Sequence, residues 1–535
     1  MSVLVRLVLA AGSGGLLFLS FPPRPLWFLA PIAIAIIASV LSTGGVGKKG
    51  GFLYGYLFGL GFFLPLLPWI GVYVGPLPWI ALCVAEALFV GIFGIVAVLV
   101  SRLRFAPLWI AAAWSLAEWL RSSAPFGGLP WGRLAFGQSE SLLLPVAELG
   151  GAPLLSFAVA LTGTGLAALI RVVATAERRT VRGVAGTLAL TVFWPVVAAI
   201  VGTTLAGPTE GDRTITVAAI QGSVPKLGLD FNSQRRKVLD NHVQETLRLA
   251  DEVDAGRQPK PDVVVWPENA SDIDPLRNSD AAIEISAASE RIGAPILVGA
   301  VLVNSDGTTT NSVLVWNGDR GVGERHDKKI IQPFGEYLPY RSFFRLFSSY
   351  ADSAGNFVPG DGNGVVHVND NRDLSGPADL AVGVATCYEV AFDRALHESV
   401  ESGAQIIAVP TNNATFGDTE MTYQQLAMSR VRAVEHSRTV VVAATSGVSA
   451  IVAPDGSVTE RTNLFDADFL VSSVGIRSGI TLATRLGAIP EYVLAAVAVL
   501  AGAVAVFSTR RGAATGYSPG GETTNRPPAV GKDAR

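Results

Sequence analysis

The chain acquires a new pattern at Ile215-Thr216-Val217-Ala218-Ala219-Ile220, a short run of apolar and β-branched residues. A helical stretch follows at about 233–254, and a second apolar run, Asp262-Val263-Val264-Val265-Trp266, comes next. Runs of this kind predict strands, and strands that alternate with helices predict a layered α/β architecture. The pattern continues to the region of Arg477, so we expect an α/β domain over residues 212–477.

More elements of the same two kinds follow within this domain. Apolar runs predict strands, and amphipathic stretches between them predict helices. The predicted strands lie at about 295–303, 379–386, 404–409, 439–444 and 448–453, and the predicted helices lie near 280–291, 390–402 and 420–437. A domain of this length is large enough to bury one substantial core.

The part of the chain before this domain has the composition of a membrane protein. Half of the 535 residues are hydrophobic and only 16% are charged, whereas soluble domains are about 25% charged. Residues 1–207 hold few charges outside short basic clusters. A membrane-spanning helix needs about 20 mainly apolar residues. We expect an α-helical transmembrane bundle of about eight spans, at 4–20, 26–42, 52–74, 78–100, 106–120, 142–170, 183–206 and 488–508.

The loops between these spans differ in their content of Lys and Arg. Basic residues collect at Lys48 and Lys49, at Arg102 and Arg104, and in the 171–182 segment, while the alternate loops hold fewer. Because Lys and Arg gather on the cytoplasmic side, we expect a cytoplasmic N-terminus and an extracytoplasmic α/β domain. The last segment, 509–535, is rich in Gly, Pro, Ser and Thr and is expected to be a disordered cytoplasmic tail.

Three carboxylates, Glu86, Glu118 and Glu148, fall inside or at the ends of predicted spans. Such residues usually face a bundle interior or a water-filled cavity. They line a substrate entrance or make hydrogen bonds between helices, and the sequence leaves both interpretations open.

Composition and motifs exclude several other classes of protein. The formal net charge is −3 and no aromatic-interleaved basic patch occurs, so we expect no nucleic-acid partner. The chain lacks zinc-site motifs, a Gly-x-Ser-x-Gly elbow and a phosphate-binding loop, so we expect no metal and no cofactor. Its two cysteines, Cys83 in an apolar span and Cys387 in the α/β domain, are expected to be free thiols.

Three segments combine reactive residues with the ends of predicted strands. Glu268 follows an apolar run in Trp-Pro-Glu-Asn, Lys328 precedes a Pro-Phe-Gly turn with Glu336, and Cys387 ends a β-rich run in Ala-Thr-Cys-Tyr-Glu. Catalytic groups of α/β proteins occur at such strand ends. We also expect a helix beginning near Val390 to lower the pKa of the Cys387 thiol. Taken singly, Glu268 could be a strand terminator and Lys328 part of a solvated basic loop.

Together these motifs resemble the catalytic triad of the nitrilase superfamily, in the order Glu268, Lys328 and Cys387. Their combination with seven spans before the domain and one after it resembles the apolipoprotein N-acyltransferase family. The resemblance covers nearly the whole chain and includes Gln221-Gly222 at the first strand and the loop from Glu118 to Trp131. It implies a nitrilase-like αββα sandwich held outside the cell membrane by a multi-pass bundle.

The resemblance also implies a two-step reaction. An acyl chain passes from a membrane phospholipid to Cys387 as a thioester, and the N-terminal amine of a diacylated lipoprotein then attacks the thioester. Glu268 would act as the general base, and Lys328 with the Tyr388 N–H would stabilise the oxyanion. Glu336 and Glu389 would orient Lys328 and the pocket. Further expected contributors to substrate binding or support of the site are Phe334, Tyr388 and Asn269.

Two positions depart from the pattern of some family members that carry Trp. This chain has Phe231 in one and Thr415 in the other, and we expect both to bear on the choice of acyl chain or phospholipid. Two other functions compete with acyl transfer: a membrane-tethered nitrilase-type amidase that hydrolyses a C–N bond, and a non-catalytic scaffold on the same fold. Eight spans disfavour the amidase, because one helix would suffice as an anchor, and the complete set of triad residue types disfavours the scaffold.

Overall fold

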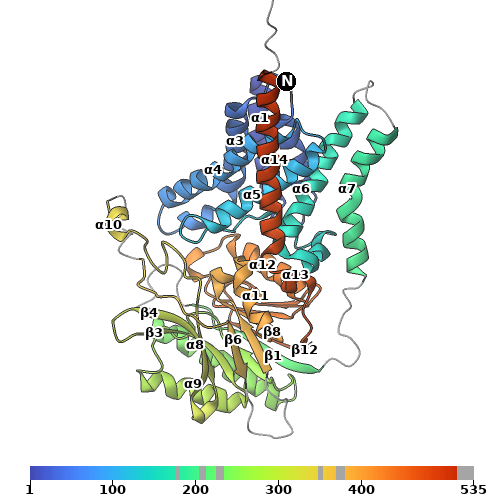
Figure 1. Ribbon diagram of the computed structural model, residues 1–535. Helices are drawn as coiled ribbons and strands as arrows, with labels where there is room; N and C mark the ends of the chain where they lie inside the picture. The colour runs from blue at the N-terminus through green and yellow to red at the C-terminus, as the bar shows by residue number, and fades with distance from the viewer. Residues whose placement is uncertain (175–180, 204–212, 225–233, 347–353, 369–379, 515–535) are drawn as a thin grey trace, which may run out of the picture.

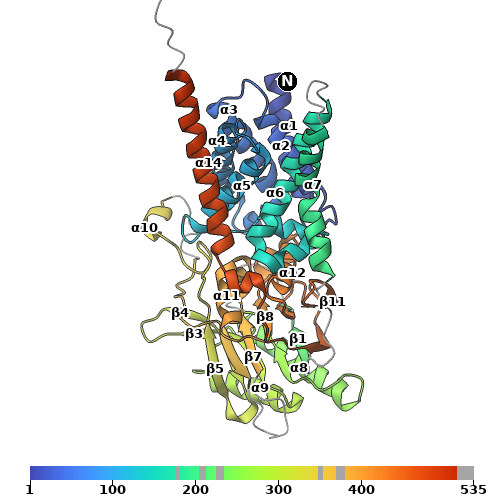
Figure 2. The same cartoon turned by 45° about the vertical axis from the view of Figure 1, so that its right-hand side comes forward.

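A helical bundle occupies one end of the molecule, and two β-sheets with their own covering helices occupy the other (Figures 1 and 2). The computed structural model describes residues 1–174, 181–203, 213–224, 234–346, 354–368 and 380–514. Phe231 lies outside these residues. The chain passes from the bundle to the sheet end after Gly202 and returns to the bundle with the helix that begins at Ile489.

A helix occupies each of the eight segments in which the sequence predicts a span. These helices are α1 (Val3–Leu19), α2 (Leu29–Leu41), α3 (Lys48–Leu66), α4 (Pro76–Val100), α5 (Ala106–Ser123), α6 (Ala147–Ala174), α7 (Val181–Gly202) and α14 (Ile489–Ala514). Among the described residues, four stretches are long and apolar enough to cross a membrane, and they belong to α4, α6, α7 and α14. Helices α1 and α2 are apolar but shorter. The number of eight spans therefore stays a prediction.

Two of these helices end at different places from those predicted. Helix α3 ends at Leu66 instead of near residue 74, because Pro68 has no N–H to continue the helical hydrogen bonds and a short 3₁₀ turn, Pro68–Gly71, follows. Helix α14 continues to Ala514, into the segment predicted to be a tail, and residues 515–535 lie outside the described part.

Contacts inside the bundle support a structural role for two of the three carboxylates. Glu118 accepts hydrogen bonds from the Trp114 indole and the Leu134 N–H, each at 2.8 Å. Glu86 pairs with Arg121 at 3.6 Å, which links α4 to α5. Glu148 lies in the first turn of α6.

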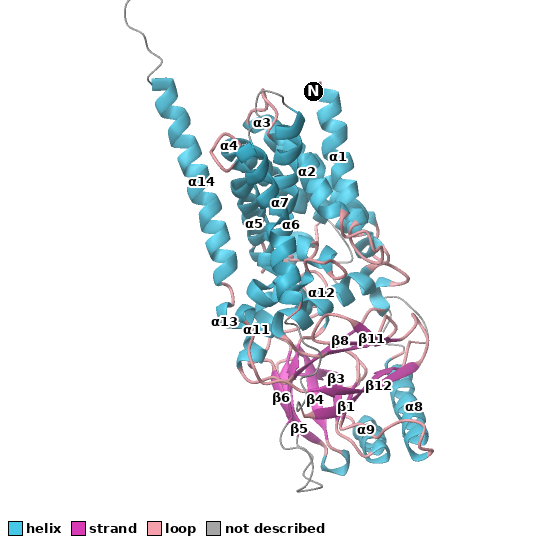
Figure 3. Cartoon of the chain, turned by 90° about the vertical axis from the view of Figure 1, so that its right-hand side faces the viewer, coloured by secondary structure: helices cyan, strands magenta, loops and turns pink. Residues whose placement is uncertain are grey.

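Two six-stranded sheets form the other end of the molecule (Figure 3). The first has the order β12-β1-β2-β3-β4-β5, with β1 (Thr214–Gln221), β2 (Val263–Val265), β3 (Ile296–Val303), β4 (Thr309–Trp316), β5 (Val322–Asp327) and β12 (Asp468–Gly475). The second has the order β11-β10-β9-β8-β7-β6, with β6 (Val365–Val368), β7 (Leu380–Val384), β8 (Ile406–Thr411), β9 (Val440–Ala444), β10 (Ala450–Val452) and β11 (Val458–Arg461).

The two sheets share one plan. Three parallel strands stand at the centre of each, β1-β2-β3 in the first and β7-β8-β9 in the second, and antiparallel strands flank them. Central parallel strands are buried on both faces and read as continuous apolar runs, such as Val263-Val264-Val265. Two predicted site residues follow the carboxyl ends of central strands: Glu268 follows β2, and Cys387 follows β7.

Four layers pack around three groups of buried side chains. Facing side chains of the two sheets make one core, including Val217, Val265 and Val382. Helices α8 (Arg235–Asp254) and α9 (Ser279–Ile292) cover the outer face of the first sheet. Helices α11 (Asp393–Glu401) and α12 (Met421–His436) cover the second sheet, and their buried residues continue into the core of the bundle. The predicted αββα sandwich is confirmed, and two short helices, α10 (Arg341–Phe344) and α13 (Leu482–Leu486), complete the described elements.

Candidate active site

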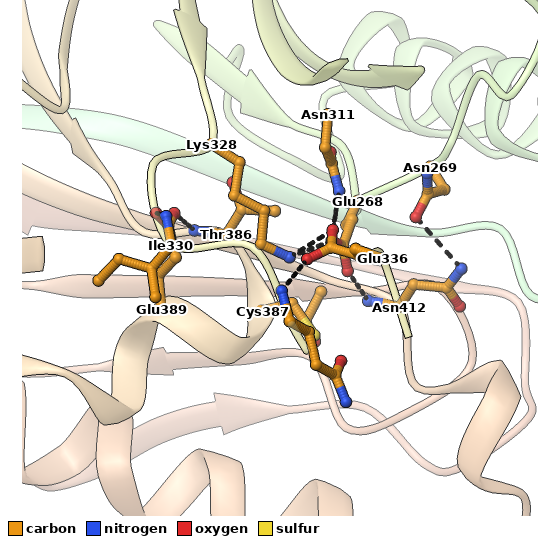
Figure 4. Close-up of polar contacts among 12 residues, drawn as sticks. Glu268, Asn269, Asn311, Lys328, Ile330, Glu336, Thr386, Cys387, Glu389 and Asn412 are labelled. Atoms are coloured by element: carbon orange, nitrogen blue, oxygen red, sulfur yellow. Dashed lines mark hydrogen bonds and ion pairs between the residues drawn. The ribbon is translucent and has the colours of Figure 1, made fainter. Parts of the chain in front are cut away.

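The three predicted triad residues come together at strand ends (Figure 4). Glu268 follows β2, Lys328 follows β5 directly, and Cys387 lies three residues beyond the end of β7. Because β2 and β7 are central parallel strands of facing sheets, their carboxyl ends open on one shared site. All three side chains are buried.

Lys328 lies between two carboxylates. Its Nζ donates to Glu268 Oε1 at 3.0 Å and to Glu336 Oε1 at 2.9 Å. Asn311, from β4, donates to the same two oxygens at 2.7 and 3.0 Å. Each carboxylate uses its second oxygen for a backbone N–H, that of Asn412 for Glu268 and that of Gln332 for Glu336. The ammonium and both carboxylates are therefore held in defined positions.

Lys328 is only 2% exposed and remains a cation. Burial by itself would lower its pKa, but the carboxylates of Glu268 and Glu336 outweigh burial and raise the pKa well above the usual lysine value. A permanent positive charge at this position suits the stabilisation of a developing oxyanion. The solvated basic loop is excluded for Lys328, although its neighbour Lys329 pairs with Glu398 nearer the surface.

The backbone holds Cys387 in a left-handed conformation, with φ of 52°. This conformation costs a non-glycine residue about 1 to 2 kcal/mol. Glu389 stabilises the turn: it accepts the Thr386 N–H at 2.8 Å in a capping box. Its other oxygen accepts the N–H groups of Lys329 and Ile330, each at 2.9 Å. Glu389 thus ties the segment that bears the thiol to the residues that follow Lys328.

The predicted lowering of the Cys387 pKa is wrong. Burial, followed by the negative charge of Glu268, raises the pKa of this thiol to about 12. Cys387 begins a short 3₁₀ turn, Cys387–Ala391, and the α-helix that follows starts only at Asp393. The influence of a helix N-terminus falls off within one turn, so the α-helix that follows Cys387 in the chain begins too late to offset burial. A base would be needed to remove the thiol proton, and Glu268 is the carboxylate whose charge acts on this thiol.

Hydrogen bonds of Tyr388 and Gln424 connect the α/β domain to the helical bundle. The Tyr388 hydroxyl donates to the carbonyl of Gly128, in the loop after α5, at 3.0 Å. Gln424, on α12, accepts from the indoles of Trp69 and Trp131 and donates to the Leu66 carbonyl. The loop between α5 and α6 therefore reaches the α/β domain.

Asn269 and Phe334 share the left-handed conformation of Cys387, with φ of 59° and 65°. Asn269 accepts a long hydrogen bond of 3.5 Å from the side chain of Asn412. Phe334 is 49% exposed and contacts the rings of Phe126 and Phe344. Backbone strain of this kind concentrates at functional sites. Asn269 lies within the polar network, whereas Phe334 lies at its exposed margin.

The structure adds three residues that the sequence did not indicate. Asn311 bridges both carboxylates, Asn412 contacts Glu268 through its N–H, and Gln425 donates to the Cys387 sulfur at 3.6 Å. Asn412 follows β8, so the strand-end rule could have found it. The sequence around Asn311 and Gln425 has no motif or strand end that would indicate a site residue.

Thr415 is the second position at which this chain departs from family members that carry Trp. It lies in a 3₁₀ turn next to Phe416, which packs against Trp69.

The described residues contain no group of three or more His, Cys, Asp and Glu side chains that could hold a metal ion. The chemistry on view consists of a thiol, a buried ammonium, carboxylates and amide donors. This set can form and resolve an acyl-thioester by proton transfer and oxyanion stabilisation.

Known proteins match both halves of the chain. Residues 13–165 match a family model described as "Apolipoprotein N-acyltransferase N-terminal domain", and residues 202–478 match one described as "Carbon-nitrogen hydrolase". A protein of Mycolicibacterium smegmatis named "Apolipoprotein N-acyltransferase" is 50% identical over 514 residues, covering 92% of this chain and 84% of that protein. One of Photobacterium profundum with the same name is 27% identical and covers 91% and 92%. The crystal structure of Saccharomyces cerevisiae Nit3, a member of the nitrilase superfamily, has 15% identity and a TM-score of 0.36, covering 52% and 95%.

The order of the two matched regions is that of the helical bundle followed by the sandwich. Identity of 50% extends over both regions. The chain therefore belongs to the apolipoprotein N-acyltransferase family, within the carbon-nitrogen hydrolases.

Proposed function

We propose that this N-acyltransferase moves a fatty acyl chain from a membrane phospholipid, through a thioester on Cys387, to the N-terminal amine of diacylglyceryl-cysteine in an apolipoprotein. The observation that carries the proposal is the buried thiol beside the Lys328 ion pairs, in a domain that packs directly against apolar helices. A lipid ester and a lipidated amine both stay in the bilayer, so a site next to the bundle is where they can meet.

In the first step Glu268 takes the proton of the Cys387 thiol as the sulfur attacks the ester carbonyl. Lys328 and the N–H of Tyr388 stabilise the oxyanion. The glycerol oxygen then leaves and receives the proton from Glu268. In the second step Glu268 takes a proton from the amine as the amine nitrogen attacks the thioester carbonyl. The C–S bond then breaks, the sulfur receives that proton from Glu268, and an amide forms, which restores the Cys387 thiol and the Glu268 carboxylate.

Glu336 and Glu389 support this chemistry indirectly. Glu336 competes with Glu268 for the Lys328 ammonium, which keeps the ammonium centred between them. Glu389 holds the turn that presents the thiol. Phe334 and its aromatic neighbours offer an apolar margin against which an acyl chain can pack.

The test is acyl-enzyme formation by the purified protein with phospholipid labelled in its acyl chain. We expect hydroxylamine-sensitive label on the protein, and its transfer to a diacylated lipopeptide. Cys387→Ala should abolish the label, whereas Glu268→Gln should mainly slow its appearance, by about 10²- to 10⁴-fold. Cys83→Ala is the matched control, because this second buried cysteine lies in α4, and it should label normally.

Failure of the wild type to acquire label, while the lipopeptide stays unmodified, would refute the proposal. Full transfer by Cys387→Ser would refute the assignment of the nucleophile. Label that forms but passes to water in the presence of the lipopeptide would favour the amidase.

We also propose that all eight apolar helices cross the cell membrane, with the N-terminus cytoplasmic and residues 212–477 outside. The distribution of Lys and Arg among the loops supports this topology. Cys387 is a poor reporter for a large, charged maleimide because it is buried, so cysteines at the exposed positions Ser305 and Lys48 serve better than this thiol, which only a small, neutral reagent suits. A membrane-impermeant maleimide should label Ser305→Cys in intact spheroplasts and Lys48→Cys only after lysis. The reverse pattern would overturn the orientation.

A further inference from the structure

The sulfur of Cys387 faces the side chain of Gln425, in the second turn of α12. Gln425 Nε2 lies 3.6 Å from Cys387 Sγ, within the longer range of hydrogen bonds to sulfur. Gln425 is 1% exposed, so this amide is part of the wall around the thiol. The roles proposed above for Glu268 and Lys328 concern the proton and the carbonyl oxygen. The sulfur also carries negative charge, both when it attacks and when it leaves.

Other contacts determine which end of the Gln425 amide points at the sulfur. Its Oε1 accepts a hydrogen bond from the Thr411 hydroxyl and another from Asn413 Nδ2, each at 2.9 Å. Asn413 Nδ2 also lies 3.1 Å from the Met421 sulfur, a weak acceptor. The opposite orientation of Gln425 would set two NH₂ groups against each other. The donor end of the amide is therefore directed at Cys387.

We propose that Gln425 is a further catalytic residue of the acyl transfer, which donates a hydrogen bond to the Cys387 thiolate. The bond strengthens as negative charge develops on the sulfur, since hydrogen bonds to charged acceptors are stronger than neutral ones. It assists the attack on the phospholipid ester and, in the second step, the departure of the sulfur from the tetrahedral intermediate. The hydrogen bond transfers no proton, so the proton transfers assigned to Glu268 are the same with and without Gln425. The inference rests on the proposed function.

The surroundings of the thiol show why such a donor matters. Burial and the charge of Glu268 both disfavour the thiolate, and Lys328 and the Asn412 N–H favour it. Gln425 brings a neutral donor to the same sulfur without adding a second cation that would compete with Lys328 for the carboxylates. Its position on α12, 38 residues from Cys387, makes the second sheet and its covering helix act together on one atom.

The experiment measures the reactivity of the thiol without lipid. In a Cys83→Ala background, the rate constant for alkylation of Cys387 by iodoacetamide is recorded between pH 7 and 9, well below the pKa of the thiol. Gln425→Leu removes the donor. Loss of a hydrogen bond to a charged group lowers the thiolate fraction roughly 10- to 100-fold, and the greater nucleophilicity of the more basic thiolate offsets part of this loss. We expect alkylation about three- to tenfold slower than in the parent protein.

Gln424→Leu is the matched control. It removes the same kind of amide from the adjacent position of α12, where the contacts are Trp69, Trp131 and Leu66. Its alkylation rate should equal that of the parent. In lipid assays Gln425→Leu should lower kcat for acylation with little change in KM for phospholipid, because the donor acts on the sulfur and not on the lipid.

A folded Gln425→Leu protein that is alkylated at the parental rate would overturn the inference. If this variant does not fold, Gln425→Glu replaces it, since its carboxylate still accepts from Thr411 and Asn413. The added negative charge beside the sulfur should slow alkylation, and a parental rate would again overturn the inference. Because alkylation needs no lipid, a protein that fails to form an acyl-enzyme can still show the effect of Gln425, so the two proposals can fail separately.

Discussion

Two clusters of buried charge in this protein are built in different ways. The active-site cluster has one lysine, Lys328, between Glu268 and Glu336. The second, which we call the interface cluster, has two arginines and three carboxylates: Arg133, Asp393, Arg432, Glu435 and Glu491. Arg133 bridges Asp393 and Glu491 at 2.7 and 2.6 Å. Arg432 bridges Asp393 and Glu435 at 2.6 and 2.5 Å.

The interface cluster joins four parts of the chain, one of which is α12, with Arg432 and Glu435. Arg133 comes from the loop between α5 and α6, Glu491 begins α14, and Asp393 begins α11 just after the turn that bears Cys387. Arg432 also donates to the carbonyls of Val390 and Ala391, within that turn. The cluster therefore fastens the bundle and the last helix to the segment that presents the thiol.

The difference lies in the type of cation and in its neighbours. A guanidinium forms several directed hydrogen bonds at once and keeps its charge, so it suits a fixed joint. The lysine ammonium is a compact charge beside a thiol and a carboxylate that can exchange a proton. Buried charge alone thus does not identify a catalytic site; an adjacent nucleophile with a perturbed pKa does.

The largest effect expected from this comparison is that of Lys328→Met. Acyl-enzyme formation should slow by about a thousandfold or more, because loss of one oxyanion donor costs about 10²- to 10³-fold and two carboxylates are left without their cation. Single-turnover labelling with phospholipid measures the rate. Lys329→Met is the matched control, since the neighbouring lysine pairs with Glu398 away from the thiol, and it should stay within a few-fold of wild type. If Lys328→Met acquired label at the wild-type rate, the proposed difference between the active-site cluster and the interface cluster would be refuted.

Arg432→Met tests the interface cluster, and its effect should appear in stability. Removing one partner of a buried ion pair leaves uncompensated charge, so we expect the free energy of unfolding to fall by about 3 kcal/mol. Arg430→Met, two residues earlier on α12, removes an arginine that pairs with the exposed Glu140 and donates to the Gly456 carbonyl, and it should cost about 1 to 2 kcal/mol. Denaturant unfolding in detergent compares the two. Equal losses from both variants would contradict a special role for the cluster.

The sequence predicted the central strands because they are continuous apolar runs. Among the described strands, β1, β2, β3, β7, β8, β9 and β10 lie where such runs occur. The strands that were missed have other patterns. Strand β5 reads Val-Gly-Glu-Arg-His-Asp and is largely exposed, as suits the edge of a sheet. Because β5 was missed, Lys328 could be interpreted as part of a solvated loop until its motif was combined with Glu268 and Cys387.

The sequence predicts the site residues that come soon after a strand. It does not predict the residues that reach the site through contacts between distant parts of the chain. Glu268, Lys328 and Cys387 are brought together in the structure, in the order expected from their motifs. Asn311 is an ordinary polar residue at the start of an edge-side strand, and Gln425 is one of two adjacent glutamines on a helix. The sequence near Cys387 shows a helix that could lower the pKa of the thiol. It does not show the burial of the thiol in the folded domain, and burial is the larger influence.

The free energy of unfolding should depend on the active-site cluster at alkaline pH and on the interface cluster at acid pH. These pH effects should be smaller than the effects of Lys328→Met and Arg432→Met. Burial raises the pKa of the Cys387 thiol from about 9 to about 12, so the folded state keeps a proton that the unfolded chain releases. The stability due to this shift is fully present below pH 9 and is lost as the pH rises toward 12. Between pH 8 and 10 the free energy of unfolding of the wild type should fall by about 1 kcal/mol more than that of Cys387→Ala.

At acid pH the group to follow is Asp393 of the interface cluster. Burial opposes the ionised carboxylate, but Arg133 and Arg432 outweigh burial and lower the pKa of Asp393. The stability due to this shift is therefore present above about pH 4 and is lost as the pH falls below it. Asp393→Asn should therefore flatten only the acid limb of the stability profile and Cys387→Ala only the alkaline limb, and a single variant that flattened both would mean that the two clusters are coupled.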